Sequence, residues 1–110
     1  MRIAVASQGL DVAPWFLHCS SYMCYRVERG LITDCHNMPN LSMSSQQTAH
    51  LMHDLGITVV LANNMEGSAK TALEAAGIEV VEGMSGTASA AARQYVTNTL
   101  AGTESDLEMA

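Results

Sequence analysis

The sequence has few positive charges. It carries five Lys and Arg residues against eleven Asp and Glu residues, which gives a formal net charge of -6. A nucleic-acid partner requires basic side chains clustered on one face to neutralise phosphates, and an anionic membrane surface requires the same kind of patch. We therefore expect neither nucleic acid nor a membrane among the partners of this protein.

Long apolar runs are missing as well. No run approaches the roughly 18 residues that span a bilayer, and the apolar start over residues 1–6 passes directly into polar residues, unlike a signal-peptide core. Three cysteines are an odd number, so without a secretory signal we do not expect a disulfide framework. These absences predict a soluble, cytoplasmic protein whose thiols are free or bound to a metal.

Familiar catalytic patterns are also absent: the sequence shows no paired carboxylates, no nucleophile elbow and no phosphate-binding loop. A length of 110 residues fits one domain with a single core. Within it, all three cysteines and two of the four histidines lie in the first third of the chain. The sequence therefore indicates this region as the place to look for chemistry.

Hydrophobic periodicity and turn residues predict the element order βββαβαβα. Strands are expected at 2–7, 20–28, 31–38, 57–62 and 78–82, and helices at 44–55, 67–76 and 87–100. Crossovers through single helices make the first, fourth and fifth strands parallel, while the second runs antiparallel in its hairpin. We predict an α/β fold with a mixed five-stranded sheet of order 3-2-1-4-5, in the three-layer ribonuclease-H-like arrangement. The domain should span residues 1–101, followed by an acidic, disordered tail over 102–110.

The register of the expected hairpin decides whether two thiols lie close together. A two-residue turn at Arg29-Gly30 would place Cys24 directly opposite Cys35, with Cβ atoms about 5 Å apart. That geometry allows a redox pair or a shared metal. A bulged turn would shift the register by one residue and separate the thiols, and two small buried hydrophobic residues are the other interpretation.

Several segments carry a family resemblance through their combined order. They are Arg2-Ile3-Ala4-Val5-Ala6-Ser7, the strand and Gly turn over 22–32, Ile57-Thr58-Val59-Val60-Leu61-Ala62, Gly67-Ser68-Ala69, residues 72–80, and Ser85-Gly86-Thr87. Over residues 1–102 the chain resembles the NifX-like, dinitrogenase iron-molybdenum cofactor biosynthesis family, which includes the molybdenum-copper orange protein of sulfate reducers. The resemblance implies a non-enzymatic binder or carrier of an anionic metal-sulfur cluster, of iron-molybdenum-cofactor or molybdenum-copper sulfide type. It also implies a cluster-biosynthesis or redox protein as a partner.

The chain departs from the family at two loops. Family members often carry His-Phe-Gly-Arg where this chain has Trp15-Phe16-Leu17-His18, so His18 would have to supply the imidazole. A Gly-Gly-Ile-Gly loop is replaced by Asn63-Asn64-Met65-Glu66, whose side chains must narrow or re-line the pocket. Cys19 matches a position where many members carry Cys or Ala. Cys19 and His18 are therefore the candidate metal ligands, with a loop thiol and a solvated imidazole as the alternative.

Ligands of open α/β sheets bind beyond the carboxyl ends of the parallel strands. The segments 7–10, 15–19, 63–67 and 84–87 should meet at that edge, with His36 and Met38 nearby. The last two segments open helices, so their unpaired N–H groups and dipoles could hold an anion without Lys or Arg. The expected cofactor-binding residues are Ser7, Trp15, Phe16, His18, Cys19, Asn63, Asn64, Met65, Gly67, Met84, Ser85, Gly86 and Thr87.

Other interpretations stay open at this point. Met65 and Met84 could be a soft contact surface for the ligand or could pack beneath their loops. Nuclease chemistry on such a sheet needs several carboxylates to hold Mg²⁺, and the nearby candidates, Asp11 and Glu66, do not lie on strands. An exposed Trp15-Phe16-Leu17 segment could instead anchor a partner protein without any metal.

Overall fold

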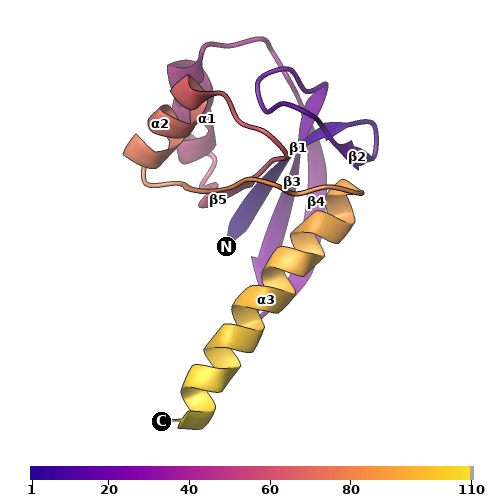
Figure 1. The fold of residues 1–110 in the computed structure, drawn as a ribbon, viewed down its shortest axis with the longest axis vertical. Helices are drawn as coiled ribbons and strands as arrows, with labels where there is room; N and C mark the ends of the chain where they lie inside the picture. Colours follow the sequence, from indigo (N-terminus) through magenta and orange to yellow (C-terminus); the bar gives the residue numbers. More distant parts are fainter. Residues whose placement is uncertain (110) are drawn as a thin grey trace.

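A computed structural model describes residues 1–109 of the chain; residue 110, the last of the expected tail, lies outside them. Over these residues, four strands precede the first helix, and two further strands then alternate with two further helices (Figure 1). The strands are β1 (Arg2–Gln8), β2 (Asp11–Val12), β3 (Ser21–Glu28), β4 (Leu31–Pro39), β5 (Val59–Leu61) and β6 (Glu79–Val81), and the helices are α1 (Ser45–Asp54), α2 (Gly67–Ala75) and α3 (Ala88–Met109).

The strands form one mixed sheet with β1 at its centre. Its order is β4-β3-β1-β5-β6, and the short strand β2 pairs with the end of β1. Strand β1 runs antiparallel to β3 and parallel to β5, and β5 runs parallel to β6. The predicted α/β class, with a mixed sheet and three helices, is confirmed. Strand β2 is an addition that the sequence did not predict.

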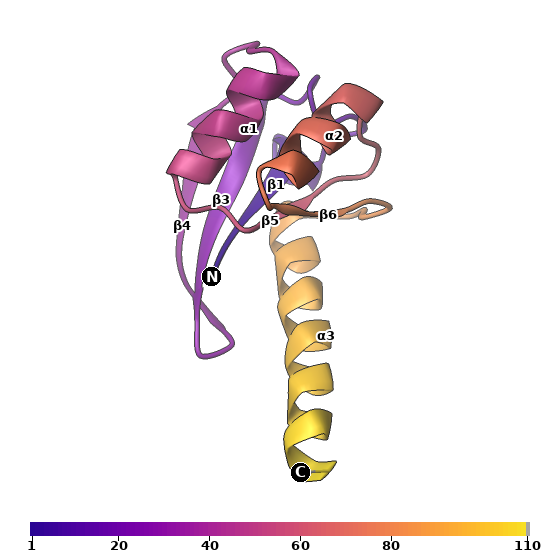
Figure 2. The same cartoon turned by 90° about the vertical axis from the view of Figure 1, so that its left-hand side faces the viewer.

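The sheet is covered on both faces (Figure 2). Helices α1 and α2 pack on one face, where Met52 and Leu73 join Ala4 and Tyr22 of the sheet. Helix α3 packs on the other face through small side chains such as Ala92. Five successive residues of β1 are buried because the strand supplies both cores alternately, as is usual for a central strand covered on both faces.

Local signals in the sequence set the ends of the first helix. Ser44 forms a capping box with Gln47 at the start of α1, and Gly56, with φ of 77°, follows its end. Helix α3 differs from expectation because it continues from Ala88 to Met109 and projects past the sheet (Figures 1 and 2). Among residues 1–109, no helix is both long enough and apolar enough to cross a bilayer.

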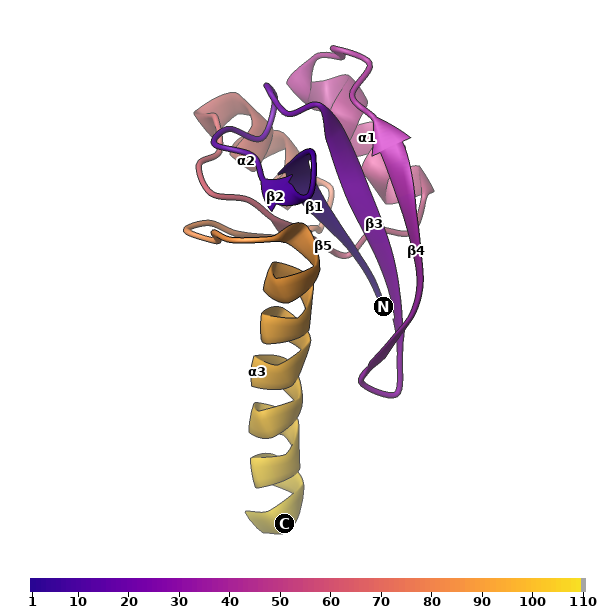
Figure 3. The ribbon, with the colours of Figure 1, turned by 90° about the vertical axis from the view of Figure 1, so that its right-hand side faces the viewer.

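The β3–β4 hairpin (Figure 3) contains a bulge in its pairing, and this bulge separates the two thiols. The pairing register shifts between Arg26 and Val27, so Cys24 lies opposite His36 and Cys35 lies opposite Tyr25. Successive residues of a strand point to opposite faces, and a shift by one places the two thiols on opposite faces of the sheet. Cys24 is buried beside α1 and α2, whereas Cys35 is exposed. The direct pairing is therefore wrong, as is the alternative in which both thiols are buried.

We expect brief alkylation of the native protein at about pH 8 to label Cys35 first, because Cys19 and Cys24 are buried. Burial raises the pKa of Cys24 to about 11, so its thiol stays protonated until the pH approaches that value. Peptide mass mapping after a fixed time measures each site. A Cys24–Cys35 disulfide in oxidised, folded protein would contradict this register.

Candidate functional site

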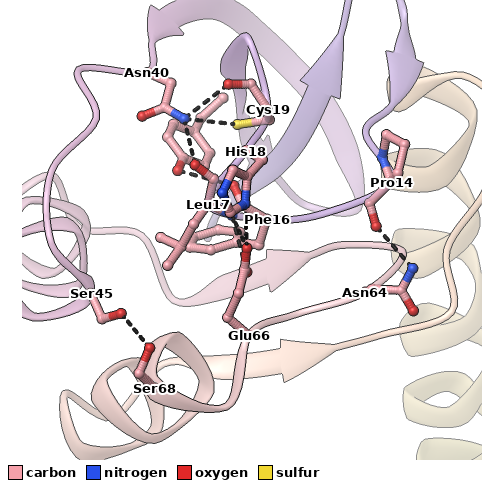
Figure 4. Close-up of polar contacts among 11 residues, drawn as sticks. Pro14, Phe16, Leu17, His18, Cys19, Asn40, Ser45, Asn64, Glu66 and Ser68 are labelled. Atoms are coloured by element: carbon pink, nitrogen blue, oxygen red, sulfur yellow. Dashed lines mark hydrogen bonds and ion pairs between the residues drawn. The ribbon is translucent and has the colours of Figure 1, made fainter.

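Two loops meet beyond the carboxyl ends of the parallel strands β1 and β5 (Figure 4). We call residues 14–19 the edge loop and residues 63–66 the helix-leading loop. The Phe16 N–H donates to the Asn64 carbonyl oxygen at 3.0 Å, and the Asn64 N–H donates to the Pro14 carbonyl oxygen at 3.2 Å. The Asn64 side-chain amide adds a second bond to Pro14 at 2.9 Å. The edge loop therefore pairs with the helix-leading loop almost as a short strand would.

The inner side of the edge loop belongs to the core. Phe16 is fully buried, and its ring centroid lies 5.1 Å from that of Tyr22. The Tyr22 hydroxyl donates to the Phe16 carbonyl oxygen at 3.2 Å. Only Trp15 of the suggested docking segment is exposed, since Leu17 is half-buried. The expectation that Trp15, Phe16 and Leu17 are exposed together is therefore wrong.

Asn40 holds the other side of the edge loop. Its side-chain amide donates to the carbonyl oxygen of Leu17 at 3.0 Å and to that of Cys19 at 2.9 Å. Both carbonyl groups lie in a loop, where they have no partner strand to donate a hydrogen bond, and the Asn40 side chain donates instead. No local pattern predicts this role, because Asn40 follows a strand in a segment typical of any polar turn.

Glu66 was considered from the sequence only as a loop replacement and a possible Mg²⁺ ligand, and its role in holding the edge loop was missed. Its carboxylate accepts the Leu17 N–H at 3.1 and 3.3 Å, and it lies 3.0 Å from Nδ1 of His18. An ionised carboxylate can only accept hydrogen bonds, so this His18 nitrogen carries the proton and donates. Glu66 occupies the N-cap position of α2 but makes no side-chain cap bond. Its negative charge is therefore held by donors of the edge loop.

The two candidate metal ligands do not converge. The His18 side chain is 80% exposed and faces Glu66, whereas Cys19 is buried next to Asn40. Burial raises the pKa of the Cys19 thiol, which opposes formation of the thiolate that a metal prefers. Over the part of the chain that the structure describes, no group of three or more His, Cys, Asp or Glu side chains could hold a metal ion.

Two N–H groups at the start of α3 are already paired within the protein. Thr87 Oγ1 accepts the Ala90 N–H at 3.2 Å, and the Ala88 N–H donates to the Leu10 carbonyl oxygen at 2.8 Å. The Gly86 carbonyl oxygen in turn accepts the Val12 N–H. The N–H groups of Ala88 and Ala90 are therefore not free for an anion, and β2 and its turn, unpredicted from the sequence, contact the loop here.

The other expected contacts lie around these loops in different settings. Asn63 donates to the Met84 carbonyl oxygen at 3.0 Å, which joins the helix-leading loop to the segment 84–87. Met65 is buried in the core and Met84 is partly buried, so both pack beneath their loops. Ser7 is fully buried and donates to the Ser21 carbonyl oxygen at 3.1 Å. Of the expected cofactor-binding residues, the exposed ones are Trp15, His18, Asn64, Gly67, Ser85, Gly86 and Thr87.

His36 and Met38 separate on strand β4. Met38 pairs with Tyr22 one residue before the strand's last pair, near the edge loop. His36 instead lines a small cavity of about 150 Å³ together with Arg2 and Leu55. Arg2 begins β1 and Leu55 ends α1, so this cavity lies toward the other end of the sheet. His36 is therefore placed away from the edge where we expected it.

Comparison with known family models and with solved structures points to one protein family. The model of the family described as "Dinitrogenase iron-molybdenum cofactor" matches residues 1–98. The apo form of the orange protein from Desulfovibrio gigas is similar in structure, with 28% sequence identity, a TM-score of 0.68, and coverage of 92% of this chain and 88% of that one. No curated protein matches the chain.

Two further solved structures share the fold at lower sequence identity. The protein PH0822 has a TM-score of 0.82 with 18% identity, covering 89% of this chain and 90% of its own. A putative dinitrogenase from Methanocaldococcus jannaschii has a TM-score of 0.75 with 10% identity, covering 89% of each chain.

We expect Asn40→Ala to lower the free energy of unfolding by about 1 to 3 kcal/mol, because it removes a donor shared by two loop carbonyls. Released from Asn40, the edge loop should also expose Trp15 further. Chemical denaturation and Trp15 fluorescence measure the two effects, since the chain has one Trp. Asn37→Ala, at an exposed position of β4, is the matched control and should change stability by no more than about 0.5 kcal/mol. Equal effects of the two variants would refute the role assigned to Asn40.

Proposed function

The chain belongs to the dinitrogenase iron-molybdenum cofactor family, and we propose that it is a non-enzymatic binder or carrier of an anionic metal-sulfur cluster. The family match over residues 1–98 and the likeness to the orange protein support this proposal. The cargo would be a cluster of the iron-molybdenum-cofactor type or a molybdenum-copper sulfide. It would be received from, or passed to, a cluster-biosynthesis or redox protein.

One observation about the edge loop carries the proposal physically. A carboxylate, that of Glu66, is already held there by the Leu17 N–H and by His18, with no Lys or Arg in contact. Hydrogen bonds to charged groups are stronger than those between neutral groups. A protein with a net charge of -6 can therefore still bind an anion at this edge.

The ligand set favours a preassembled cluster over a bare metal ion. A bare ion needs several protein ligands around it, and the described residues gather no such group. A metal-sulfur cluster brings its own sulfide ligands and a negative charge. Amide N–H groups, the first turn of α2 and the His18 ring can contact those sulfides without replacing them. His18 would then be a contact of secondary importance, and the buried Cys19 would help to shape the seat.

Buried side chains hold the two loops in place beneath their exposed residues. Trp15, Asn64 and Gly67 are exposed around the Glu66 carboxylate's loop, while Phe16 and Met65 fix the backbone from below. Such an arrangement can present donors in fixed directions, which lowers the entropy lost when a ligand binds. We propose that exposed residues of the edge loop contact the cluster and that buried ones shape its seat.

Anaerobic protein mixed with tetrathiomolybdate and copper should develop visible charge-transfer bands and should retain molybdenum through gel filtration. Elemental analysis of the protein peak measures the retained metal. Absence of retained metal with every metal-sulfur cluster tested would contradict the carrier proposal.

Two variants that add the same negative charge at different loops test where the cluster binds. Gly67→Asp places a carboxylate at the exposed first residue of α2, where an added Cβ meets no atom within 4 Å. We expect it to weaken cluster retention roughly tenfold through charge repulsion at the edge. Ser85→Asp adds a carboxylate in the exposed loop before α3, where the Ala88 and Ala90 amides are already paired, and its cluster retention should stay near wild type. Greater loss in Ser85→Asp would move the site to the α3 loop.

A further inference from the structure

We propose that Glu66 is an internal competitor of the cluster and decides which anions the edge accepts. This inference rests on the proposed function and deepens it. The Glu66 carboxylate uses the Leu17 N–H and His18 Nδ1, which are donors that an anionic ligand of the edge loop would need. Because two anions cannot share these donors, a cluster must displace the carboxylate before it can contact them.

The cation nearest in the chain, Lys70, pairs with another carboxylate and does not hold Glu66. Lys70, the cation on α2, pairs with Glu82 at 3.2 Å rather than with Glu66. Glu82 also accepts the Met65 N–H at 3.2 Å, so its position is fixed by two partners. Glu66 has His18 as its ion-pair partner, and that ring is largely exposed. Glu66 also has two partners, the Leu17 N–H and His18, but neither is a Lys or Arg, so a ligand that displaces its carboxylate breaks no bond to one of these cations.

Displacement need not carry Glu66 far. The residue is the N-cap of α2, and a carboxylate near a helix N-terminus is favoured by the helix dipole and by the unpaired amides there. A displaced side chain can therefore remain on the protein surface beside α2. Its attachment to the backbone gives it a high effective concentration at the edge-loop donors. Only a ligand that binds those donors better than a tethered carboxylate will enter, which excludes chloride and other weakly bound monoanions.

Three variants separate the charge of Glu66 from its support of the loop. Glu66→Gln removes the charge but keeps an amide oxygen that can accept the Leu17 N–H, so the edge loop should stay docked. Glu66→Ala removes both. Glu74→Gln, at an exposed position of the same helix, changes the net charge equally and is the matched control. Trp15 fluorescence and circular dichroism report whether the edge loop and the fold are intact in each protein.

The experiment measures retention of tetrathiomolybdate with copper by each protein at fixed ionic strength, with and without added chloride. We expect Glu66→Gln to bind about tenfold more tightly than wild type and to become more sensitive to chloride. Glu74→Gln should match wild type. Glu66→Ala should also gain affinity, by less if its Trp15 emission shows an undocked loop.

The outcomes distinguish this inference from the proposed function. If wild type binds and Glu66→Gln binds equally or more weakly with its loop docked, Glu66 is not a competitor and the inference is overturned, while the carrier function stands. If Glu66→Gln alone binds, Glu66 is shown to be a competitor, but the carrier proposal fails for the wild-type protein with this cluster. If neither binds, the edge is no anion site, and both the inference and the proposed function fail.

Discussion

The candidate site depends on the pairing between the edge loop and the helix-leading loop. Backbone hydrogen bonds join Pro14 and Phe16 to Asn64, and the buried Phe16 ring fixes the loop to the core against Tyr22. Without this pairing the Leu17 N–H and His18 would have no fixed direction, and Glu66 would have no partner. Neither loop belongs to a long strand or helix, so their order comes from tertiary contacts.

An acidic protein that binds an anion needs hydrogen-bond donors that its own acceptors leave available. At the start of α3 the chain uses its own carbonyl and hydroxyl groups to satisfy the first amides. At the edge loop it uses a carboxylate, which is a group that another anion can replace. At the start of α3 the Thr87 side chain accepts a helix amide, whereas at the start of α2 the Glu66 side chain makes no cap bond and contacts the edge loop instead. That difference is what confines the proposed ligand to one side of the sheet edge.

Regular elements were predictable because their signals are local. The Ser44 cap, Gly56 and the apolar strands can be read without knowing any distant contact. The hairpin bulge could not, because nothing in Thr33 or its neighbours distinguishes a bulged strand from a plain one. Phe16 is ambiguous for another reason: an aromatic residue in a loop fits an exposed anchor and a core residue equally well. The bonds of Glu66 and Asn40 join segments more than 20 residues apart, which no local pattern encodes.

The most direct test of the account is to locate the bound cluster by amide chemical shifts in nitrogen-15-labelled protein. On titration with the molybdenum-copper sulfide, the account predicts the largest changes at the amides of Leu17, His18 and Gly67. The groove between β4 and α3, lined by Cys35 and Arg93, should change little. Large changes centred on that groove, with the edge loop unaffected, would contradict the account.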